Sequence, residues 1–276
     1  MSQPPNTSKP TEHKGAAFQL NSCIQFLLVF CGHIGYLVTL VGVVLASVFI
    51  LLPLTPFPRL RRRVAGTMLR GYLKFFALYY IPASRACRIV EISGGDRIPR
   101  PGAAVFVANH RSAIDAILLL PLLPPTSLII KARHARKLGY ACLVHFFDFV
   151  TMEAGSLSVL RRSMDKCRRL MAEGMSLLVF PEGMRTSSTT LMPFADLPFR
   201  IAIEQGVPII PVVIHSDRPF LNRRKGSYFP PETVRFRIQF LEPISTENER
   251  DPIRLSDVAS HRMAAALADL DRMYPQ

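Results

Sequence analysis

His110 and Asp115, five positions apart, are residue types that can share a proton. They follow the apolar run V-F-V-A at residues 105–108, which is typical of a buried strand. If a helix begins just after His110, its first turns bring the carboxylate back to the imidazole. The aspartate then keeps one ring nitrogen protonated, and the other nitrogen can accept a proton from a hydroxyl. This interpretation makes His110 a general base and Asp115 the residue that orients it.

A second polar segment, F-P-E-G-M-R-T at residues 180–186, follows the apolar run S-L-L-V-F. Loops at the carboxyl ends of parallel strands are where α/β sheets bind ligands. Glu182 can accept hydrogen bonds from substrate hydroxyls, and Arg185 can bind a phosphate or a carboxylate. Gly183 permits a tight turn, and Thr186 adds a small donor. Taken alone, a histidine and an aspartate at this spacing are more often surface residues, and a segment such as 180–186 is more often a plain loop. Together, the two motifs favour a functional site.

From residue 88 onward, short apolar runs alternate with helical periods, which predicts a single α/β domain with a mostly parallel sheet. The strict alternation of V-R-F-R-I-Q-F-L at residues 234–241 predicts an edge strand with one wet face. Ser256 and Asp257 can cap a last helix that ends near Met273. The expected buried strands are 105–108, 128–130, 149–152, 177–180 and 209–214, and the expected helices lie near 113–121, 133–146, 156–173 and 194–205.

Residues 15–58 contain no Asp, Glu, Lys or Arg, and their apolar centre, residues 24–54, is long enough to span a bilayer. One tilted helix and a bent pair lying in one leaflet both fit this length. A signal peptide is less favoured, because the apolar run is long and its start is only weakly basic. The sequence therefore divides into a disordered tail (1–14), a membrane anchor with an interfacial helix (15–82) and a catalytic domain (83–276).

Pro53, Pro56 and Pro58 are expected to stop the apolar helix. Four arginines follow at once, at positions 59, 61, 62 and 63. By the positive-inside rule, they place that end of the anchor in the cytoplasm, next to anionic headgroups. The expected location is the inner (cytoplasmic) membrane, with the catalytic domain facing the cytoplasm.

The net charge of +14 points to an anionic partner. The apolar N-terminal third favours an anionic membrane surface, and the chain has no Trp, zinc-finger spacing or RNA-binding motif, so nucleic acid is not an expected partner. The five cysteines are odd in number and include no CxxC pair, which argues against a disulfide framework and a metal site.

The two motifs together resemble those of the glycerolipid (lysophospholipid) acyltransferase family, typified by 1-acyl-sn-glycerol-3-phosphate acyltransferases. N-H-x4-D at residues 109–115 is similar to the family's catalytic block, and F-P-E-G-x-R at residues 180–185 is similar to its acceptor-binding block. The run V-P-I-I-P-V at residues 207–212 resembles a fourth block. The resemblance covers residues 85–245.

The resemblance implies that His110, oriented by Asp115, deprotonates an acceptor hydroxyl, which attacks an acyl thioester on coenzyme A or acyl carrier protein. The thioester is a co-substrate, and no metal, resident cofactor or covalent acyl-enzyme is expected. The implied acceptor is the lyso-lipid 1-acyl-glycerol-3-phosphate, giving phosphatidate in phospholipid biosynthesis. The residues expected to bind substrate are Asn109, Arg111, Lys131, Glu182, Gly183, Arg185 and Thr186.

The sequence departs from the family pattern at three places, one of which is F-A-D-L-P at residues 194–198, where the family has a glycine-rich stretch. Met184 stands where the acceptor-binding block has Thr, and Glu153 stands where the second block has Arg. Lys131 matches the early Lys of that second block, and Arg161 and Arg162 follow it and could compensate. An acid where a phosphate clamp is expected favours, as an alternative acceptor, a non-phosphate lyso-lipid such as an aminolipid or a glycolipid.

Two other functions use the same residues differently. A thioesterase-like hydrolase would use His110 and Asp115 on water, and a basic membrane-surface scaffold would need no chemistry. The absence of a G-x-S-x-G elbow argues against an ordinary serine hydrolase. His215, after the run that ends at Ile214, either lines the site or caps a loop.

Overall fold

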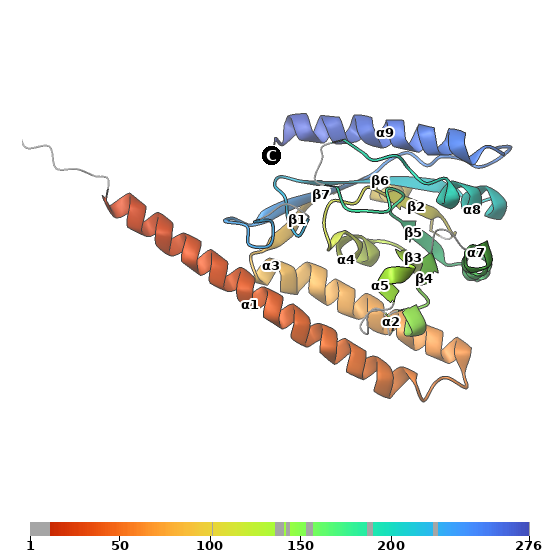
Figure 1. Ribbon diagram of the computed structural model, residues 1–276, viewed down its shortest axis with the longest axis horizontal. Coiled ribbons are helices and arrows are strands. Elements are labelled where there is room, and N and C mark those ends of the chain that lie inside the picture. The colour runs from red at the N-terminus through yellow and green to blue at the C-terminus, as the bar shows by residue number, and fades with distance from the viewer. Residues whose placement is uncertain are drawn as a thin grey trace, which may run out of the picture.

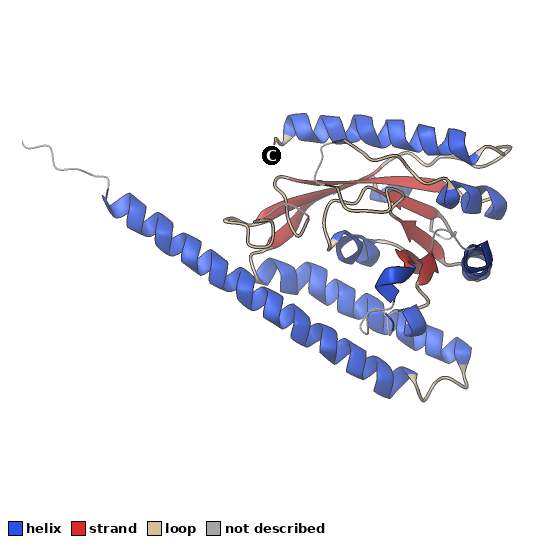
Figure 2. Cartoon of the chain, viewed as in Figure 1, coloured by secondary structure: helices blue, strands red, loops and turns tan. Residues whose placement is uncertain are grey.

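The computed structural model describes residues 12–100, 102–135, 141, 144–152, 157–186, 190–222 and 226–275. Seven strands within these ranges form one sheet in the order β1-β7-β6-β2-β5-β3-β4 (Figures 1 and 2). Every neighbouring pair is parallel except β6 with β7. The strands are β1 (Cys87–Ser93), β2 (Val105–Ala108), β3 (Thr126–Lys131), β4 (Val150–Met152), β5 (Ser176–Val179), β6 (Ile209–Ser216) and β7 (Val234–Phe240). The expected fold class, a mostly parallel sheet flanked by helices, is confirmed.

Helices cover both faces of the sheet (Figure 1). They are α1 (Glu12–Leu51), α2 (Pro58–Phe75), α3 (Ile81–Ala83), α4 (Asp115–Leu119), α5 (Ala132–Ala135), α7 (Leu157–Ala172), α8 (Leu197–Gln205) and α9 (Pro252–Met273). Side chains alternate along a strand, so Val105 and Val107 of β2 pack with α7, α8 and α9, whereas Phe106 and Ala108 pack with α1, α2 and α4. Burial on both faces explains why β2 and β5 are unbroken apolar runs.

The sheet brings the two polar segments together. β2 and β5 are parallel neighbours, with Val107 opposite Val179. Both strands end at the same edge, so the chain that follows β2 and the chain that follows β5 emerge side by side. Residues 109–115 and 180–186 therefore meet at the carboxyl edge of the sheet, as the strand pattern predicts.

The prediction that residues 234–241 form an edge strand is wrong. β7 alternates between buried and more exposed residues, as expected, but it lies between β1 and β6. The true edge strand on that side is β1, whose Val90 and Ile92 are exposed. The alternation reports how the two faces of a strand are covered, and it carries no information on whether a partner strand lies alongside.

The start of the last helix also differs from the prediction. α9 begins at Pro252, and the side chain of Asp251 caps it by accepting the Ile253 N–H at 2.9 Å. Ser256 and Asp257 lie inside the helix, which ends at Met273 as expected. An Asp before a Pro at the first helical position is the stronger start signal.

The N-terminal apolar region is one continuous helix, α1, which packs against α2 as an antiparallel neighbour (Figure 1). α1 begins at Glu12, so residues 12–14 are helical and not part of the expected tail, whereas residues 1–11 lie outside the described ranges. Over Ser22–Leu51, the helix is long and apolar enough to cross a membrane. It ends before Pro53, while Pro58 begins α2, where a proline without an N–H costs nothing.

Candidate active site

Asn109 braces the chain where it leaves β2. Its side-chain nitrogen donates to the Ile214 carbonyl at 2.9 Å, and its oxygen accepts the Ile214 N–H at 2.7 Å. The side chain is fully buried, so both ends of the amide are used on the backbone of β6. This fixes the position at which the next residue, His110, begins. The expectation that Asn109 binds substrate stays a prediction.

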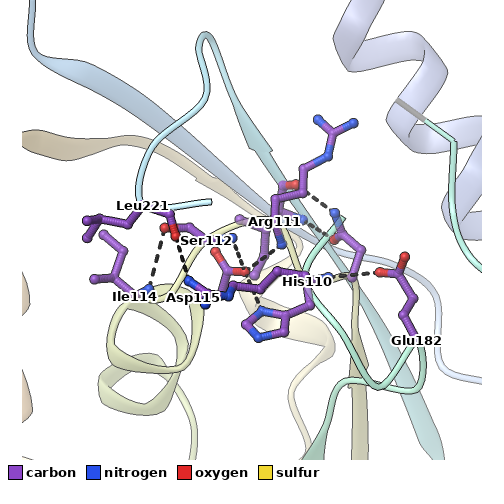
Figure 3. Close-up of polar contacts among 10 residues, drawn as sticks. His110, Arg111, Ser112, Ile114, Asp115, Glu182 and Leu221 are labelled. Carbon is purple, nitrogen blue, oxygen red and sulfur yellow. Dashed lines mark hydrogen bonds and ion pairs between the residues drawn. The ribbon is translucent and has the colours of Figure 1, made fainter. Parts of the chain in front are cut away.

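His110 and Asp115 are in direct contact, as the spacing predicts. The distance from His110 Nδ1 to Asp115 Oδ2 is 2.8 Å (Figure 3). The same oxygen accepts the N–H groups of Arg111 at 2.7 Å and Ser112 at 2.8 Å. Asp115 is fully buried at the start of α4, with these N–H donors directed at its carboxylate. With Nδ1–H donating to the carboxylate, His110 Nε2 carries the lone pair that can accept a proton.

The ring of Phe180 stacks on the imidazole of His110, with 4.3 Å between ring centroids and 24° between ring planes. Phe180 follows β5 directly, so the neighbouring strand supplies one wall of the histidine's surroundings. The imidazole side chain is 22% exposed, which leaves part of it open to a reactant. A flat aromatic wall restricts rotation of the ring and keeps water from one of its faces.

Glu182 is turned toward the backbone of the site. Its Oε1 accepts the His110 N–H at 2.9 Å (Figure 3), and its Oε2 accepts the Met192 N–H at 2.9 Å. Burial raises the pKa of Glu182, and the hydrogen bonds from the Met192 and His110 N–H groups, together with the positive charge of Arg111, oppose that rise. The carboxylate therefore ties the histidine to the segment after β5. Its predicted role as a ligand for substrate hydroxyls stays a prediction, since both oxygens already accept N–H groups.

Gly183 has a left-handed backbone conformation, with φ +64°, so the turn after Glu182 favours glycine for conformational reasons. A Cβ placed there would lie 3.4 Å from Cε and Nζ of Lys131. Lys131 is the last residue of β3, and its exposed ammonium therefore reaches the segment of residues 180–186. The structure thus brings these two predicted site residues together.

Arg185 and Thr186 connect the motif to other loops. Arg185 Nη1 donates to the Leu221 carbonyl at 2.8 Å, and that carbonyl also accepts the Ala113 N–H at 3.1 Å. The Thr186 N–H donates to the His110 carbonyl at 3.0 Å. The His110 backbone is therefore held through its N–H and its C=O by the segment after β5. Ser187 and Ser188 lie outside the described residues.

Arg111 points away from the imidazole of His110 (Figure 3). Its side chain is 8% exposed, and Nη1 lies 3.8 Å from Oδ1 of Asp271, near the end of α9. Burial lowers the pKa of Arg111, and the negative charge of Asp271 opposes this most strongly. The structure thus places the guanidinium in the protein interior, on the opposite side of the loop from the His110 imidazole. Its predicted role in binding substrate stays a prediction.

A separate cavity of about 530 Å³ lies at the opposite edge of the sheet. It is bounded by Thr126 at the start of β3, Met175 before β5, and one side of α2 from Arg59 to Leu73. None of the residues at the His110 site lines it. Among the described residues, no group of three or more His, Cys, Asp or Glu side chains is arranged to hold a metal ion.

Comparison with known proteins agrees with this geometry. Residues 89–215 match the family model described as "Acyltransferase". The chain is 28% identical over 188 residues to 1-acyl-sn-glycerol-3-phosphate acyltransferase alpha from Mus musculus, covering 66% of this chain and 64% of that protein. It is 25% identical over 239 residues to the 1-acyl-sn-glycerol-3-phosphate acyltransferase of Limnanthes alba, covering 85% and 78%. Over these residues, the chain is similar to proteins of the acyltransferase family.

The fold is also shared with a solved acyltransferase. The crystal structure of the 1-acyl-sn-glycerophosphate (LPA) acyltransferase PlsC from Thermotoga maritima superimposes with a TM-score of 0.69. The superposition covers 92% of this chain and 98% of that one, at 19% identity. The mammalian relatives are longer than the matched region, which spans 64% of the mouse alpha protein and 62% of the human beta protein.

Of the departures from the acyltransferase pattern at Met184 and Glu153, only the first lies among the described residues. Met184 is 39% exposed beside Gly183, so an apolar thioether stands at the surface of the acceptor-like motif. Glu153 lies outside the described residues, and so do Arg136, Lys137 and Cys142. Arg161 and Arg162 are exposed near the start of α7.

Some site residues carry no local sequence signal. Asp271 lies 160 positions after Arg111, inside a helix whose pattern predicts only a packed surface. Leu221 and Met192 contribute backbone groups, which side-chain chemistry does not reveal. Phe180 is the first residue of the F-P-E-G-M-R-T segment. Its position directly after a strand that neighbours β2 is a signal that could have predicted the stacking contact.

Proposed function

We propose that the chain is an O-acyltransferase that moves a fatty-acyl group from a thioester to the free hydroxyl of a lyso-lipid. The observation that carries the proposal is the His110–Asp115 pair, with 2.8 Å between Nδ1 and Oδ2 at the carboxyl edge of the sheet. A buried, triply hydrogen-bonded carboxylate stabilises the imidazolium that forms when His110 takes a proton. The relatives with matching sequence are named as enzymes with this reaction.

In the proposed reaction, His110 Nε2 removes the proton of the acceptor hydroxyl as its oxygen attacks the thioester carbonyl carbon. The C–O bond forms, and the tetrahedral intermediate then collapses with cleavage of the C–S bond. The leaving sulfur takes the proton from the His110 imidazolium, which restores the neutral base. The products are the acylated lipid and the free thiol, and Asp115 keeps its contact with Nδ1 throughout.

The proposed acceptor is 1-acyl-glycerol-3-phosphate, and the product is phosphatidate. The names of the relatives support this choice. The exposed Lys131 ammonium beside Gly183 and the Arg185 guanidinium supply positive charge at the site, which suits a phosphate. A non-phosphate lyso-lipid is the second candidate, favoured by Met184 and Glu153 at positions where the family has Thr and Arg.

The donor is proposed to be a thioester of coenzyme A or acyl carrier protein. Both carriers are polyanionic and water-soluble. The exposed cations Lys131, Arg133, Arg161 and Arg162 follow β3 and β4, whose carboxyl ends lie at the same edge as His110. Such a surface attracts an anionic carrier.

We also propose that α1 holds the enzyme at a membrane, where its acceptor resides. The helix leaves many large apolar side chains uncovered, including Phe26, Val38 and Phe49 at 52%, 66% and 75% exposure. A surface of this kind is stable in lipid and unfavourable in water. Arg59 and Arg63 at the start of α2 are exposed and would face the headgroups on the cytoplasmic side.

The test is product analysis with the purified full chain in detergent. Acyl-CoA and acyl-ACP are each offered with 1-acyl-glycerol-3-phosphate, with a lyso-aminolipid and with a lyso-glycolipid, and products are read by mass spectrometry. Phosphatidate as the main product is the expected result. Acylation of a non-phosphate acceptor alone would move the assignment to the second candidate. Free fatty acid without an acylated lipid would overturn the proposal in favour of a hydrolase.

A further inference from the structure

Three charged or titratable side chains meet behind the loop of residues 109–115, on the side away from the imidazole. Asp271 of α9 lies 3.8 Å from Nη1 of Arg111 and 3.3 Å from Nε2 of His215, both distances measured from its Oδ1. His215 is fully buried on β6, and the side chain of Asp271 is 23% exposed. One carboxylate thus connects the C-terminal helix to the loop and to the neighbouring strand.

The charges of these three side chains show which two of them, Arg111 and Asp271, form an oppositely charged pair. Burial lowers the pKa of His215, and although Asp271 and Asp217 oppose this, Arg111 and Arg237 add to it. The imidazole is therefore neutral at neutral pH, and Arg111 is the cation that faces Asp271. Arg237 is occupied elsewhere, with its guanidinium carbon 3.3 Å from the centre of the Tyr274 ring. A buried guanidinium is costly unless a carboxylate pairs with it, and Asp271 is in position to do so.

The pair is joined to the catalytic residues through the backbone. The N–H of Arg111 donates to the Asp115 oxygen that holds His110. On the other side of His110, Asn109 is bound to Ile214, which directly precedes His215 in β6. His110 therefore lies between Asn109, which is hydrogen-bonded to β6, and Arg111, which forms an ion pair with a carboxylate of α9.

We propose that Asp271 is a positioning residue for catalysis, which holds Arg111 so that its backbone N–H and the Asp115 carboxylate keep His110 in its reactive orientation. The proposal rests on the proposed acyl transfer, because the reactive orientation is defined by that chemistry. It extends the site to the last turn of the chain's final helix. A purely structural Asp271 would stabilise α9 against the sheet without affecting turnover of the folded enzyme.

The experiment compares Asp271→Asn with the control Asp269→Asn in the full chain in detergent. Asp269 lies on the same turn of α9, is 57% exposed and forms an ion pair with the exposed Arg272. Asp271→Asn should lower kcat about ten- to hundredfold, since small misplacements of a catalytic group have effects of this size. KM for both substrates should change little, and Asp271→Glu should recover part of the rate. Asp269→Asn should match the unmodified protein.

A double-mutant cycle tests whether the effect passes through Arg111. If Asp271 acts by holding Arg111, the double variant Arg111→Gln, Asp271→Asn should be no slower than the slower single variant. Independent effects would multiply. A multiplied loss, or a kcat for Asp271→Asn within about twofold of the unmodified enzyme, would overturn the proposal.

Hydrogen exchange separates this proposal from the acyl transfer itself. Asp271→Asn should speed amide exchange in the peptide that contains residues 109–115, and exchange in β5 should stay unchanged. Unchanged exchange in that peptide would overturn the anchoring of the loop whatever the activity. If the unmodified chain transfers no acyl group but the exchange increase is observed, the proposed function fails and the anchoring by Asp271 stands.

Discussion

Residues 109–115 and helix α1 are fixed in the molecule by different interactions. In the loop, the side chains of Asn109 and Asp115 are fully buried, and their polar atoms bind specific backbone groups at 2.7–2.9 Å. In α1, the apolar stretch Ser22–Leu51 has only 11% of its most apolar window buried in the protein. The loop depends on the identity and geometry of single atoms, whereas the helix depends on its overall composition.

This difference has a consequence for substitutions. A change of one atom, such as oxygen to nitrogen, should disable the loop even when size and shape are kept. The same kind of change on the helix should have almost no effect, because any apolar side chain can contact lipid. Only a charge in the helix should matter there, and it should affect membrane binding and leave the chemistry intact.

The largest effect is expected for Asp115→Asn. All three hydrogen bonds end on one Asp115 oxygen, which the oxygen of Asn can replace, but the amide carries no negative charge. The imidazolium that forms when His110 takes a proton then loses its stabilising counter-charge, and kcat should fall at least about a hundredfold. Steady-state kinetics with circular dichroism as a check on folding measures this. The exposed Asp257→Asn on α9 is the control, and a kcat equal to that control would contradict the role of Asp115.

The next effect concerns the helix. Val38 and Val41 are 66% and 57% exposed near the middle of the apolar stretch. Replacing both with Lys should weaken binding to phospholipid vesicles about a hundredfold or more, because each charge at mid-membrane costs roughly 2.5–3.5 kcal/mol. Vesicle flotation measures binding, and turnover of a short-chain, water-soluble acceptor should stay unchanged. The double change to Leu should bind like the unmodified protein; if the Lys and Leu variants float alike, the membrane role of α1 is wrong.

A smaller effect is expected for Asn109→Ala. It leaves the N–H and the C=O of Ile214 without their side-chain partner, which should cost about 1–3 kcal/mol of unfolding free energy. Asn109→Asp should not restore stability, because a carboxylate can accept from the N–H but would face the carbonyl oxygen. Denaturant unfolding in detergent provides the values. Full recovery with Asp would show that the amide is not used in both directions.

The smallest effect is a pH dependence of stability from His215. Burial lowers its pKa below the ordinary value of 6.5, so below that pH the unfolded chain binds a proton that the folded chain does not. Its contribution to stability is complete above pH 6.5 and is lost as the pH falls toward its lower, folded pKa. The Tm of His215→Gln should therefore fall less between pH 7 and pH 5 than that of the unmodified protein. Equal slopes would show that folding leaves the pKa of His215 unchanged and would contradict this prediction.

Much of the fold could be predicted because the strands that hold the site are buried on both faces. β2, β5 and β6 appear in the sequence as continuous apolar runs, and their boundaries agree closely with the structure. β7 was misplaced because alternation reports exposure of a face and not the presence of a neighbouring strand. β1 was not predicted, since its mixed burial gives a weak pattern.

The site could be predicted where its residues are close in sequence and carry reactive side chains. His110 and Asp115 satisfy both conditions, and their contact follows from a strand and a helix start. Asp271 carries a carboxylate but is far from Arg111 in the sequence, and only the packing of α9 on β6 brings the two together. Glu182 shows a third situation, in which the residue was found but its hydrogen-bond partners, two backbone N–H groups, were visible only in three dimensions.

The central claim, that His110 is the base of an acyl transfer, is tested most directly by His110→Ala beside His261→Ala. His261 is an exposed histidine on α9 and serves as the matched control. Acyl transfer from a thioester to 1-acyl-glycerol-3-phosphate should fall at least about a hundredfold in His110→Ala and remain unchanged in His261→Ala. Equal transfer rates in the two variants would contradict the account.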